Sequence, residues 1–172
     1  MLGEEVLHQS LSELAPQIRA RKISPAELTE SYLQRIRRYS ERLNAFETVT
    51  PELARKEARI AESEINAGKY RGPLHGIPYG AKDLFSTAGI RTTWGAAPCR
   101  DQMFNYDATV ITRLREAGAV LLGKTTMIEF AGGLGYRFPD ASVSGPCRTP
   151  WDTTRWAGGS TRRRSSPASP RR

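Results

Sequence analysis

The segment from Gly72 to Phe85, which reads GPLHGIPYGAKDLF, constrains the fold of this chain more than any other. Proline lacks a backbone N–H and glycine weakens regular structure, so their recurrence makes the segment stiff, closely packed and non-helical. Its centre, residues 77–81, is expected to form a short buried strand. Lys82 follows directly, beside Asp83, in an otherwise uncharged run. A charge in such a place is either paired for structural reasons or retained for chemistry.

Helices are predicted before this segment. Ser10 and Ser24 each begin the pattern Ser-x-x-Glu of a capping box, in which serine and glutamate satisfy free amides at a helix start. Pro25 then occupies the first helical position, where its missing N–H costs nothing. The third predicted helix is rich in Glu, Arg and Lys, so we expect it to face solvent. The three helices are expected at residues 11–21, 25–40 and 51–67.

Strands alternate with helices in much of the chain. We expect strands at residues 44–49 and 119–122, a helix at 108–117 that is capped by Asp107, and a short helix at 127–130. Residues 132–154 are rich in loop-forming glycine and proline. The alternation of strands and helices predicts an α/β fold.

The net charge of +8 comes largely from the end of the chain. Five of the 26 basic residues lie in 162–172 (RRRSSPASPRR), which leaves 21 basic against 18 acidic residues before it. This nearly balanced body does not favour nucleic-acid binding, and the tail alone would bind weakly and non-specifically. No segment reaches the ~18 apolar residues of a membrane span, and the start of the chain lacks the layout of a signal peptide. We therefore expect a soluble, cytoplasmic protein.

The sequence indicates no metal site. Cys99 and Cys147 form no CxxC pair, and neither has metal-ligand spacing to His8 or His75. We expect both cysteines to be buried free thiols.

One phosphate-binding pattern occurs at Gly118–Thr125, GAVLLGKT, which matches G-x-x-x-x-G-K-[ST]. A phosphate-binding loop has a strand before its first glycine, a helix after its last residue and a flexible loop between them. Here a helix is predicted before Gly118, and the intervening AVLL is itself the predicted strand. We reject the nucleotide interpretation and expect no cofactor.

Two roles would explain a lysine at position 82, one catalytic and one structural. A lysine acts as a general base only when neutral, and bringing its pKa from ~10.4 to near 7 requires a shift of ~3 units. Burial beside Ile77, Tyr79 and Leu84 would disfavour the ammonium and supply this shift. Asp83 would oppose it only by approaching Lys82, and adjacent side chains on a strand point apart. The alternative is a structural lysine paired with an acid, which the residue types alone favour.

A second candidate site is the turn Gly158-Gly159-Ser160. Backbone amides of a glycine-rich turn can converge on one point, as an oxyanion hole requires. Serine with lysine is a known alternative to the Ser-His-Asp triad, and neither histidine lies beside a serine or acid motif. Such turns are also common in ordinary loops, so this one gains weight only from accompanying motifs.

Three segments of the chain together resemble the amidase signature family. They are GPLHGIPYGAKDLF, AGAVLLGKTTMIEFAGG and SGPCRTPWDTTRWAGGS, in the order and spacing of the family. With the capped helices before them, the resemblance covers residues from about 5 to 160. It implies a mixed β-sheet core surrounded by helices, of which this chain would hold only the N-terminal part.

The resemblance also implies a chemistry. Members of the family hydrolyse a small-molecule carboxylic amide to an acid and ammonia or an amine, through an acyl-enzyme formed by a Ser-cis-Ser-Lys triad, without a metal or cofactor. By this likeness Lys82 is the triad lysine and Ser160 is the bridging serine on a cis peptide bond. The substrate-binding residues implied by the resemblance are Phe130, Ala131, Gly132, Gly133, Gly158 and Gly159.

The chain departs from the family after Ser160. The family continues with a small apolar helix and a second glycine-rich motif that carries the nucleophilic serine, whereas this chain reads TRRRSSPASPRR. The serines of this tail lie too close to Ser160 to match the nucleophile. We therefore expect an amidase portion over residues 1–161, a basic disordered tail over 162–172, and no activity from this chain alone.

A frameshift after about Thr161 would explain the departure. Written in GC-rich codons and read two bases later, RRRSSPASPRR becomes Ala-Ala-Val-Val-Ala-Arg-Leu-Ala-Ala-Ala, which has the character of the small apolar helix. The codons were chosen, so this shows compatibility alone. Two other functions stay open: the A subunit of an aminoacyl-tRNA amidotransferase, which would need partner subunits, and a non-enzymatic protein whose basic tail binds nucleic acid.

Overall fold

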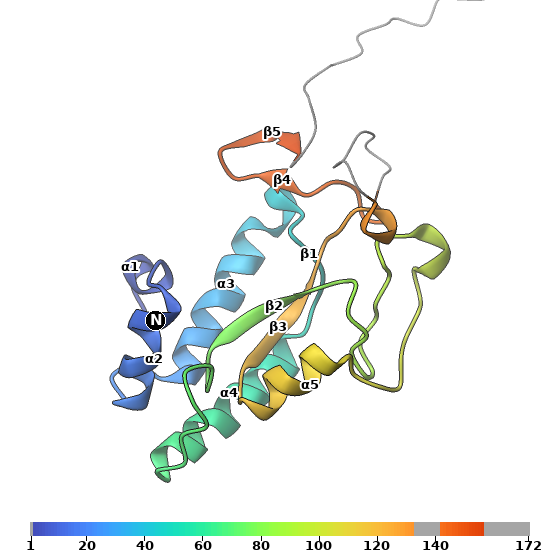
Figure 1. Ribbon diagram of the computed structural model, residues 1–172. Helices are drawn as coiled ribbons and strands as arrows, with labels where there is room; N and C mark the ends of the chain where they lie inside the picture. Colours follow the sequence, from blue (N-terminus) through green and yellow to red (C-terminus); the bar gives the residue numbers. More distant parts are fainter. Residues whose placement is uncertain (1, 133–141, 157–172) are drawn as a thin grey trace, which may run out of the picture.

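The computed structural model describes residues 2–132 and 142–156. Its centre is a three-stranded sheet in the order β1-β3-β2, in which β3 runs antiparallel to β1 and parallel to β2 (Figure 1). The strands are β1 (Phe46–Val49), β2 (Pro78–Lys82) and β3 (Val120–Thr125). The expected mixed sheet is confirmed, and its central strand β3 extends beyond the predicted 119–122.

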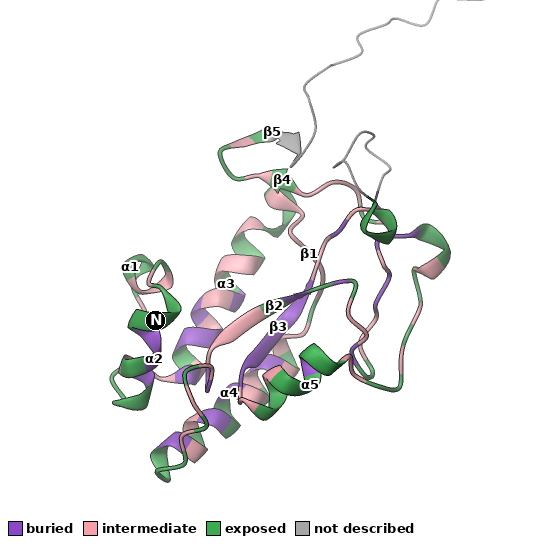
Figure 2. Cartoon of the chain, in the orientation of Figure 1, coloured by how far each residue is buried: buried purple, intermediate pink, exposed green. Residues whose placement is uncertain are grey.

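Helices cover both faces of this sheet. The α-helices in the described residues are α1 (Glu4–Leu7), α2 (Leu11–Arg19), α3 (Pro25–Leu43), α4 (Pro51–Asn66) and α5 (Thr109–Glu116). On one face, α3 and α4 pack against Val120 and Leu122 of β3. On the other, α5 packs against Leu121 through Ile111. Because its side chains enter both layers, β3 is buried along almost its whole length (Figure 2).

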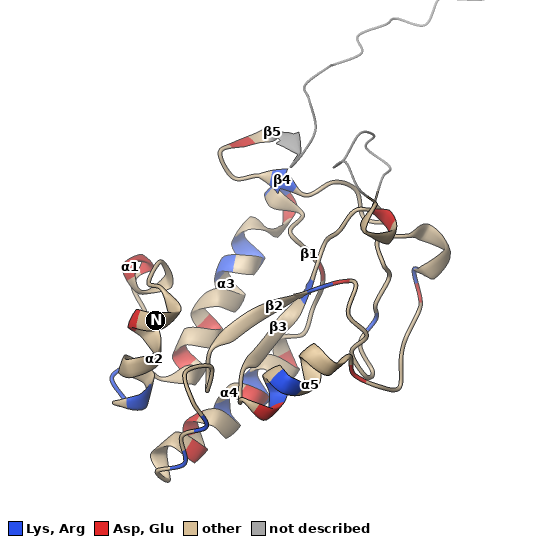
Figure 3. Ribbon diagram, viewed as in Figure 1, with Lys and Arg blue, Asp and Glu red and all other residues tan. Residues whose placement is uncertain are grey.

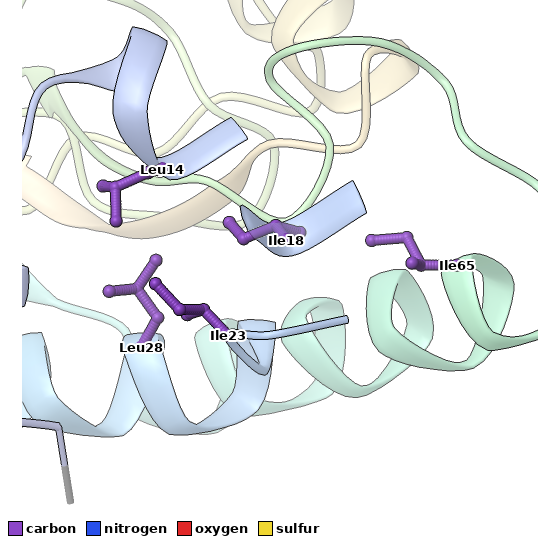
Figure 4. Close-up of a cluster of buried hydrophobic side chains, with 5 residues drawn as sticks. All are labelled: Leu14, Ile18, Ile23, Leu28 and Ile65. Carbon is purple, nitrogen blue, oxygen red and sulfur yellow. The ribbon is translucent and has the colours of Figure 1, made fainter. Parts of the chain in front are cut away.

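A separate apolar cluster joins the helices near the N-terminus. Figure 4 shows its five side chains, which converge from α2, the turn after it, α3 and α4. Ile18 and Leu28 are completely buried, and complete burial of such a side chain contributes ~1.5–3 kcal/mol. The cluster therefore fixes α2 against the α3–α4 pair. Its members are Leu14, Ile18, Ile23, Leu28 and Ile65.

Helix α4 is amphipathic, and the expectation that it faces solvent is wrong on one side. Ala54, Ala58, Ala61 and Ile65 are buried at helical spacing, and the alanines allow the helix to approach β3 closely. The charges that dominate its composition lie on the other sides of the helix. Figure 3 shows basic and acidic residues interspersed along α4 and α5, rather than one sign on one face.

The helix starts follow the sequence signals in most places. The Ser10 amide donates to Glu13 Oε2 at 2.7 Å, which closes the predicted capping box of α2. At α3, Ser24 Oγ accepts a hydrogen bond from the Glu27 amide at 3.1 Å, and Pro25 is the first helical residue as predicted. These local contacts explain why the starts of both helices were predictable.

Asp107 does not cap α5, contrary to prediction. The N-cap residue is Ala108, while Asp107 Oδ1 accepts a hydrogen bond from the Ala88 amide at 2.8 Å and its Oδ2 pairs with Arg115. The carboxylate therefore ties the start of α5 to a distant loop. Helix α3 also ends later than predicted, at Leu43, because its C-cap residue Asn44 has a left-handed φ of 48°.

Several elements have no counterpart among the predictions. They are α1, the 3₁₀ turn η1 (Ala97–Cys99), and the hairpin of β4 (Arg148–Thr149) and β5 (Asp152–Trp156), which lies in the predicted loop region. Cys99 and Cys147 are free as expected, but both are partly exposed rather than buried. Among the described helices, none combines the length and apolar character needed to cross a membrane. The predicted tail, residues 162–172, lies outside the described residues.

Candidate active site

The candidate site lies where the two parallel strands end. Lys82 is the last residue of β2 and pairs in register with Thr125, the last residue of β3. In open α/β sheets, ligands bind outside the carboxyl ends of parallel strands. The chain leaving β3 then reaches the segment Phe130–Gly132, so two of the predicted site segments follow the same edge of the sheet.

Lys82 is exposed, so the expectation that Ile77, Tyr79 and Leu84 bury it is wrong in the described part of the protein. Burial alternates at the end of β2: the side chains of Ala81 and Asp83 are buried, whereas Lys82 and Leu84 face outward. No described helix or strand forms a bond with the outward-facing side chain of Lys82. With the residues that are described, its ammonium forms neither a hydrogen bond nor an ion pair.

Asp83 turns away from Lys82, as strand alternation predicts, and pairs with a different lysine. Its Oδ1 lies 3.4 Å from Nζ of Lys124, and both side chains are almost completely buried. Lys124 Nζ also donates to the Phe85 carbonyl at 2.7 Å and to Thr92 Oγ1 at 2.6 Å. Burial lowers the pKa of Lys124, and the negative charge of Asp83 opposes that effect. The structural lysine paired with an acid is thus Lys124.

This environment agrees with rejection of the phosphate-loop interpretation. Lys124 lies inside β3 and its donors are occupied, so it cannot reach a phosphate as a loop lysine would. Gly123 has a positive φ of 155°, and a Cβ there would lie 2.2 Å from the carbonyl oxygen of Thr48. The second glycine of the pattern is therefore required for close packing of β3 on β1.

Asp83 also forms hydrogen bonds with the turn at Thr93 and Trp94, which lies beside it in space. Its Oδ2 accepts hydrogen bonds from the Thr93 amide at 2.8 Å and the Thr93 hydroxyl at 2.6 Å. The amide of Trp94 donates to the Asp83 carbonyl at 3.3 Å, and the Trp94 indole donates to the Leu84 carbonyl at 3.2 Å. The buried carboxylate thus holds Thr93, and the carbonyls of Asp83 and Leu84 hold Trp94 beside the end of β2.

The predicted substrate-binding segment forms a 3₁₀ turn, η2 (Glu129–Ala131), in place of the short helix expected at 127–130. Phe130 and Ala131 have left-handed backbones, with φ of 48° and 55°, and both are exposed together with Gly132. The Phe130 amide donates to the Trp94 carbonyl at 2.8 Å. The segment is therefore linked to Asp83 through Trp94.

Aromatic residues near this turn were not among the sequence candidates. The ring of Trp94 lies 5.8 Å from that of Phe104 and 6.3 Å from that of Phe130, and Phe104 lies 5.4 Å from Tyr106, measured between centroids. The four residues are scattered over 94–130, so no sequence pattern joins them.

The remaining predicted site residues, Gly133, Gly158, Gly159 and Ser160, lie outside the described residues. Within the described ranges, no group of three or more His, Cys, Asp or Glu side chains could hold a metal ion.

Comparison with known proteins shows which of them the chain is similar to. The family model described as Amidase matches residues 27–161. The chain is 44% identical over 155 residues to the A subunit of the glutamyl-tRNA(Gln) amidotransferase of Halorhodospira halophila, covering 90% of this chain and 31% of the relative. It is 46% identical over 158 residues to the putative amidase AmiD of Mycobacterium tuberculosis, covering 91% of this chain and 32% of the relative.

The solved structure of the native peptide amidase from Stenotrophomonas maltophilia has the same fold, with a TM-score of 0.74 at 31% identity. The match covers 86% of this chain and 31% of that structure. The chain therefore spans about a third of the length of the curated relatives it matches.

Proposed function

Because this chain belongs to the amidase family, we propose that it carries the lysine and bridging-serine portion of an amide-hydrolysing site. Lys82 would be the base and Ser160 the bridging serine. The observation that carries the proposal is the geometry at the end of β2, where Lys82 faces outward while Asp83 is held by Lys124. Lys82 is thereby separated from the Asp83 carboxylate.

The proposed reaction proceeds through an acyl-enzyme. A nucleophilic serine attacks the amide carbonyl, and its proton passes through Ser160 to neutral Lys82. The same proton then moves to the departing nitrogen, which leaves as ammonia or an amine, and water hydrolyses the acyl-serine to the acid. Backbone amides of Gly158 and Gly159 would stabilise the oxyanion, and the segment Phe130–Gly133 would border the acyl group.

The described residues do not cover the side chain of Lys82. Its side chain is exposed at the end of β2, whereas a lysine base needs the ammonium to be desolvated. The desolvation would have to come from polypeptide outside the described residues. We propose that Lys82 becomes a competent base only when that cover is in place.

These 172 residues, tested alone, are proposed to lack turnover, because no serine among them matches the position of the nucleophile. Release of ammonia or amine from a panel of amides by the purified chain measures this directly. Turnover that follows the chain through successive purification steps, and so is not due to a contaminating enzyme, would contradict the proposal.

The frameshift hypothesis is tested by the sequence of the gene. Bases downstream of codon 161 should encode a glycine- and serine-rich amidase continuation in another frame, and absence of such a continuation would refute the frameshift hypothesis.

The triad assignment is tested by substitution. In the restored polypeptide, Lys82→Met and Ser160→Ala should each lower kcat by on the order of 10⁴-fold. Lys69→Met, which removes another exposed lysine, is the matched control and should leave kcat unchanged.

A second candidate is the A subunit of an aminoacyl-tRNA amidotransferase, which the similarity to the Halorhodospira halophila protein favours. Such a protein would bind partner subunits and use glutamine as the amide donor. Co-purification with those subunits and glutamine-dependent ammonia release would support this candidate over an independent amidase.

A further inference from the structure

A cavity lies at the end of the sheet opposite to Lys82. It is lined by Gly118 and Ala119, which come just before β3, by His75, which comes three residues before β2, and by one side of α4. These loop residues precede the two parallel strands, whereas Lys82 and Thr125 end them. The cavity has a volume of about 270 Å³ and is separate from the candidate active site.

Hydrogen bonds hold together the two loops that lead into these strands. The Gly76 amide donates to the Gly118 carbonyl at 2.8 Å, and the Val120 amide donates to the Ile77 carbonyl at 2.9 Å. A Cβ on Gly118 would lie 2.3 Å from Cδ2 of His75, so the imidazole packs directly against the glycine backbone. The fold therefore fixes the ring of His75 at the wall of the cavity.

His75 brings an unused hydrogen-bond donor to this wall. Its side chain is fully buried, and its Nδ1 accepts a hydrogen bond from the Arg71 amide at 3.1 Å, so the neutral ring carries its proton on Nε2. Burial lowers the pKa of His75, which favours this neutral form. Nε2 lies 3.1 Å from Glu64 Oε2 without hydrogen-bond alignment, and no other described residue accepts from it. A buried donor without an acceptor is costly, and a ligand oxygen would remove that cost.

Lys56 supplies a second free donor at the cavity. Its side chain is exposed, and its ammonium forms neither a hydrogen bond nor an ion pair with any residue that the structure describes. The other two cations of the lining are engaged, because Arg71 pairs with Glu64 and Arg115 pairs with Asp107. A ligand with a negative charge would therefore find one uncommitted cation here.

The two carboxylates of the lining are occupied by protein donors. Glu64 accepts hydrogen bonds from Arg71 Nε at 2.7 Å and from its Nη2 at 2.6 Å. Glu57 accepts one from the Leu121 amide at 2.9 Å, and burial raises its pKa, which favours the neutral acid. The repulsion that these groups would exert on a bound anion is reduced accordingly.

Apolar side chains complete the lining. They are Leu53, Ile60, Ala61 and Ala119. The two alanines are buried, whereas Ile60 is 46% exposed at the opening. Ligand sites typically combine apolar walls with a few placed polar groups in ~300–1,000 Å³, so a cavity of about 270 Å³ suits a small ligand.

We propose that this cavity binds a small monocarboxylate with an apolar body. The carboxylate accepts a hydrogen bond from His75 Nε2 and pairs with Lys56, and the hydrocarbon part contacts Ile60 and the alanines. An inorganic anion would leave the apolar walls uncovered, and a neutral ligand would leave Lys56 without a partner. The site does not rest on the proposed amide hydrolysis, so binding is measurable without turnover.

The test is equilibrium binding of hexanoate to the 172-residue chain by isothermal titration calorimetry. Acetate, 1-hexanol and inorganic phosphate are the comparison ligands, since each lacks either the apolar body or the charge. Hexanoate should bind saturably, and each comparison ligand should bind about tenfold more weakly or not at all.

Three variants probe the lining. Lys56→Met removes the free cation and Ile60→Glu adds a negative charge at the opening, so each should raise the Kd of hexanoate about threefold or more. His75→Asn removes the Nε2 donor but keeps an acceptor in place of Nδ1, and should raise the Kd roughly tenfold. Lys22→Met and Val110→Glu make the same changes at exposed positions outside the cavity and should leave the Kd unchanged.

Absence of saturable hexanoate binding would overturn the proposal, as would acetate or phosphate binding as tightly as hexanoate. Equal losses of affinity in the cavity variants and their controls would also overturn it. Lys56 and Ile60 are exposed, so their variants should fold, which circular dichroism checks. An unchanged Kd in these two folded variants refutes the site even where His75→Asn is unstable.

Failure of this inference is distinguishable from failure of the proposed function. Hexanoate affinity that falls in Lys82→Met but not in Lys56→Met would place the ligand at the candidate active site and refute the cavity alone. Turnover of the restored polypeptide that is unaffected by Lys82→Met would refute the catalytic assignment and leave the cavity site intact.

Discussion

Lys82 and Lys124 lie at the ends of neighbouring parallel strands, and their side chains enter opposite environments. Ala81 pairs in register with Lys124, and Lys82 pairs with Thr125. Lys124 is buried with Asp83, whereas Lys82 faces outward. A structural lysine beside a candidate catalytic one explains why residue types alone could not separate the two roles.

Removal of the buried cation should be costly. Lys124→Met leaves the Asp83 carboxylate buried without its partner, which should lower the free energy of unfolding by ~3–5 kcal/mol. The double variant Asp83→Asn with Lys124→Met should lose less than the sum of the single losses, because the two groups are coupled. Urea denaturation measures all three, with Lys69→Met as an exposed control. A loss below ~1 kcal/mol for Lys124→Met would refute this role.

His75 should make the protein less stable in acid. Its side chain is buried, Nδ1 accepts a hydrogen bond from the Arg71 amide at 3.1 Å, and Nε2 lies 3.1 Å from Glu64 Oε2 without the alignment of a hydrogen bond. Burial is the largest cause that lowers the pKa of His75, the charge of Arg71 adds to it, and Glu64 opposes both. The unfolded chain therefore binds a proton more readily than the folded one.

The direction in which stability changes with pH follows from the lowered pKa of His75. The contribution of His75 is fully present above the unfolded value of ~6.5 and is lost as the pH falls through the folded pKa. His75→Asn, whose amide oxygen can replace Nδ1 as an acceptor, should flatten the pH dependence of unfolding below ~6.5 relative to the wild type. The exposed His8→Asn is the control. Parallel stability curves for wild type and His75→Asn would contradict the assignment.

The packing of helix α4 against the sheet could not be read from its amino-acid composition. Its charged residues dominate the sequence, but the buried alanines decide how closely it approaches β3. Glu57 on the same helix accepts a hydrogen bond from the Leu121 amide at 2.9 Å, near the irregular register between β2 and β3. Burial is the main reason why the pKa of Glu57 is raised. Glu57 thus supplies a hydrogen-bond acceptor for the Leu121 amide of β3.

A larger side chain on the buried stripe should separate α4 from the sheet. Ala58 is completely buried, so Ala58→Leu should destabilise the protein by ~1–3 kcal/mol through overpacking. Ala67→Leu, at the exposed end of the same helix, is the size-matched control and should change stability by less than ~0.5 kcal/mol. Equal effects at the two positions, measured by thermal or urea unfolding, would show that α4 does not pack as described.

At the scale of the whole molecule, the chain spans about a third of the length of its curated relatives. In the described residues β2 pairs only with β3, so its other edge is unpaired. Leu84, which follows β2 in the chain, and Met103 are exposed, at 39% and 61%. Unpaired strand edges beside apolar surface promote association between chains.

We therefore predict concentration-dependent self-association of the 172-residue chain. Sedimentation velocity over the micromolar to millimolar range measures it. Leu84→Lys combined with Met103→Lys should reduce association, because the double variant replaces exposed apolar side chains with charges, one of them just after the open strand. Val110→Lys on α5 adds a charge at a similarly exposed apolar position and should have little effect. A monomeric wild type across this range would contradict the prediction.

Much of the architecture was accessible from short-range signals. The Ser10 capping contact, the glycine and proline pattern before Lys82 and the alternation of strands with helices each act within a few residues, and the three family segments identified the amidase fold that the family match confirms. The Asp107 contacts and the β4–β5 hairpin were not accessible, because they depend on partners distant in sequence or on turns without a strong residue preference.

The sequence by itself determined the family, the mixed sheet and the position of Lys82 at the end of a strand. Only the tertiary structure decided which lysine is buried, which face of α4 is apolar, and that Trp94 and Phe130 lie together. Burial and ring contacts depend on which segments become neighbours in space, and side chains far apart in sequence carry no local signal of that choice. Lys82 was therefore recognisable as a candidate, whereas its exposure and the pairing of Asp83 with Lys124 were not.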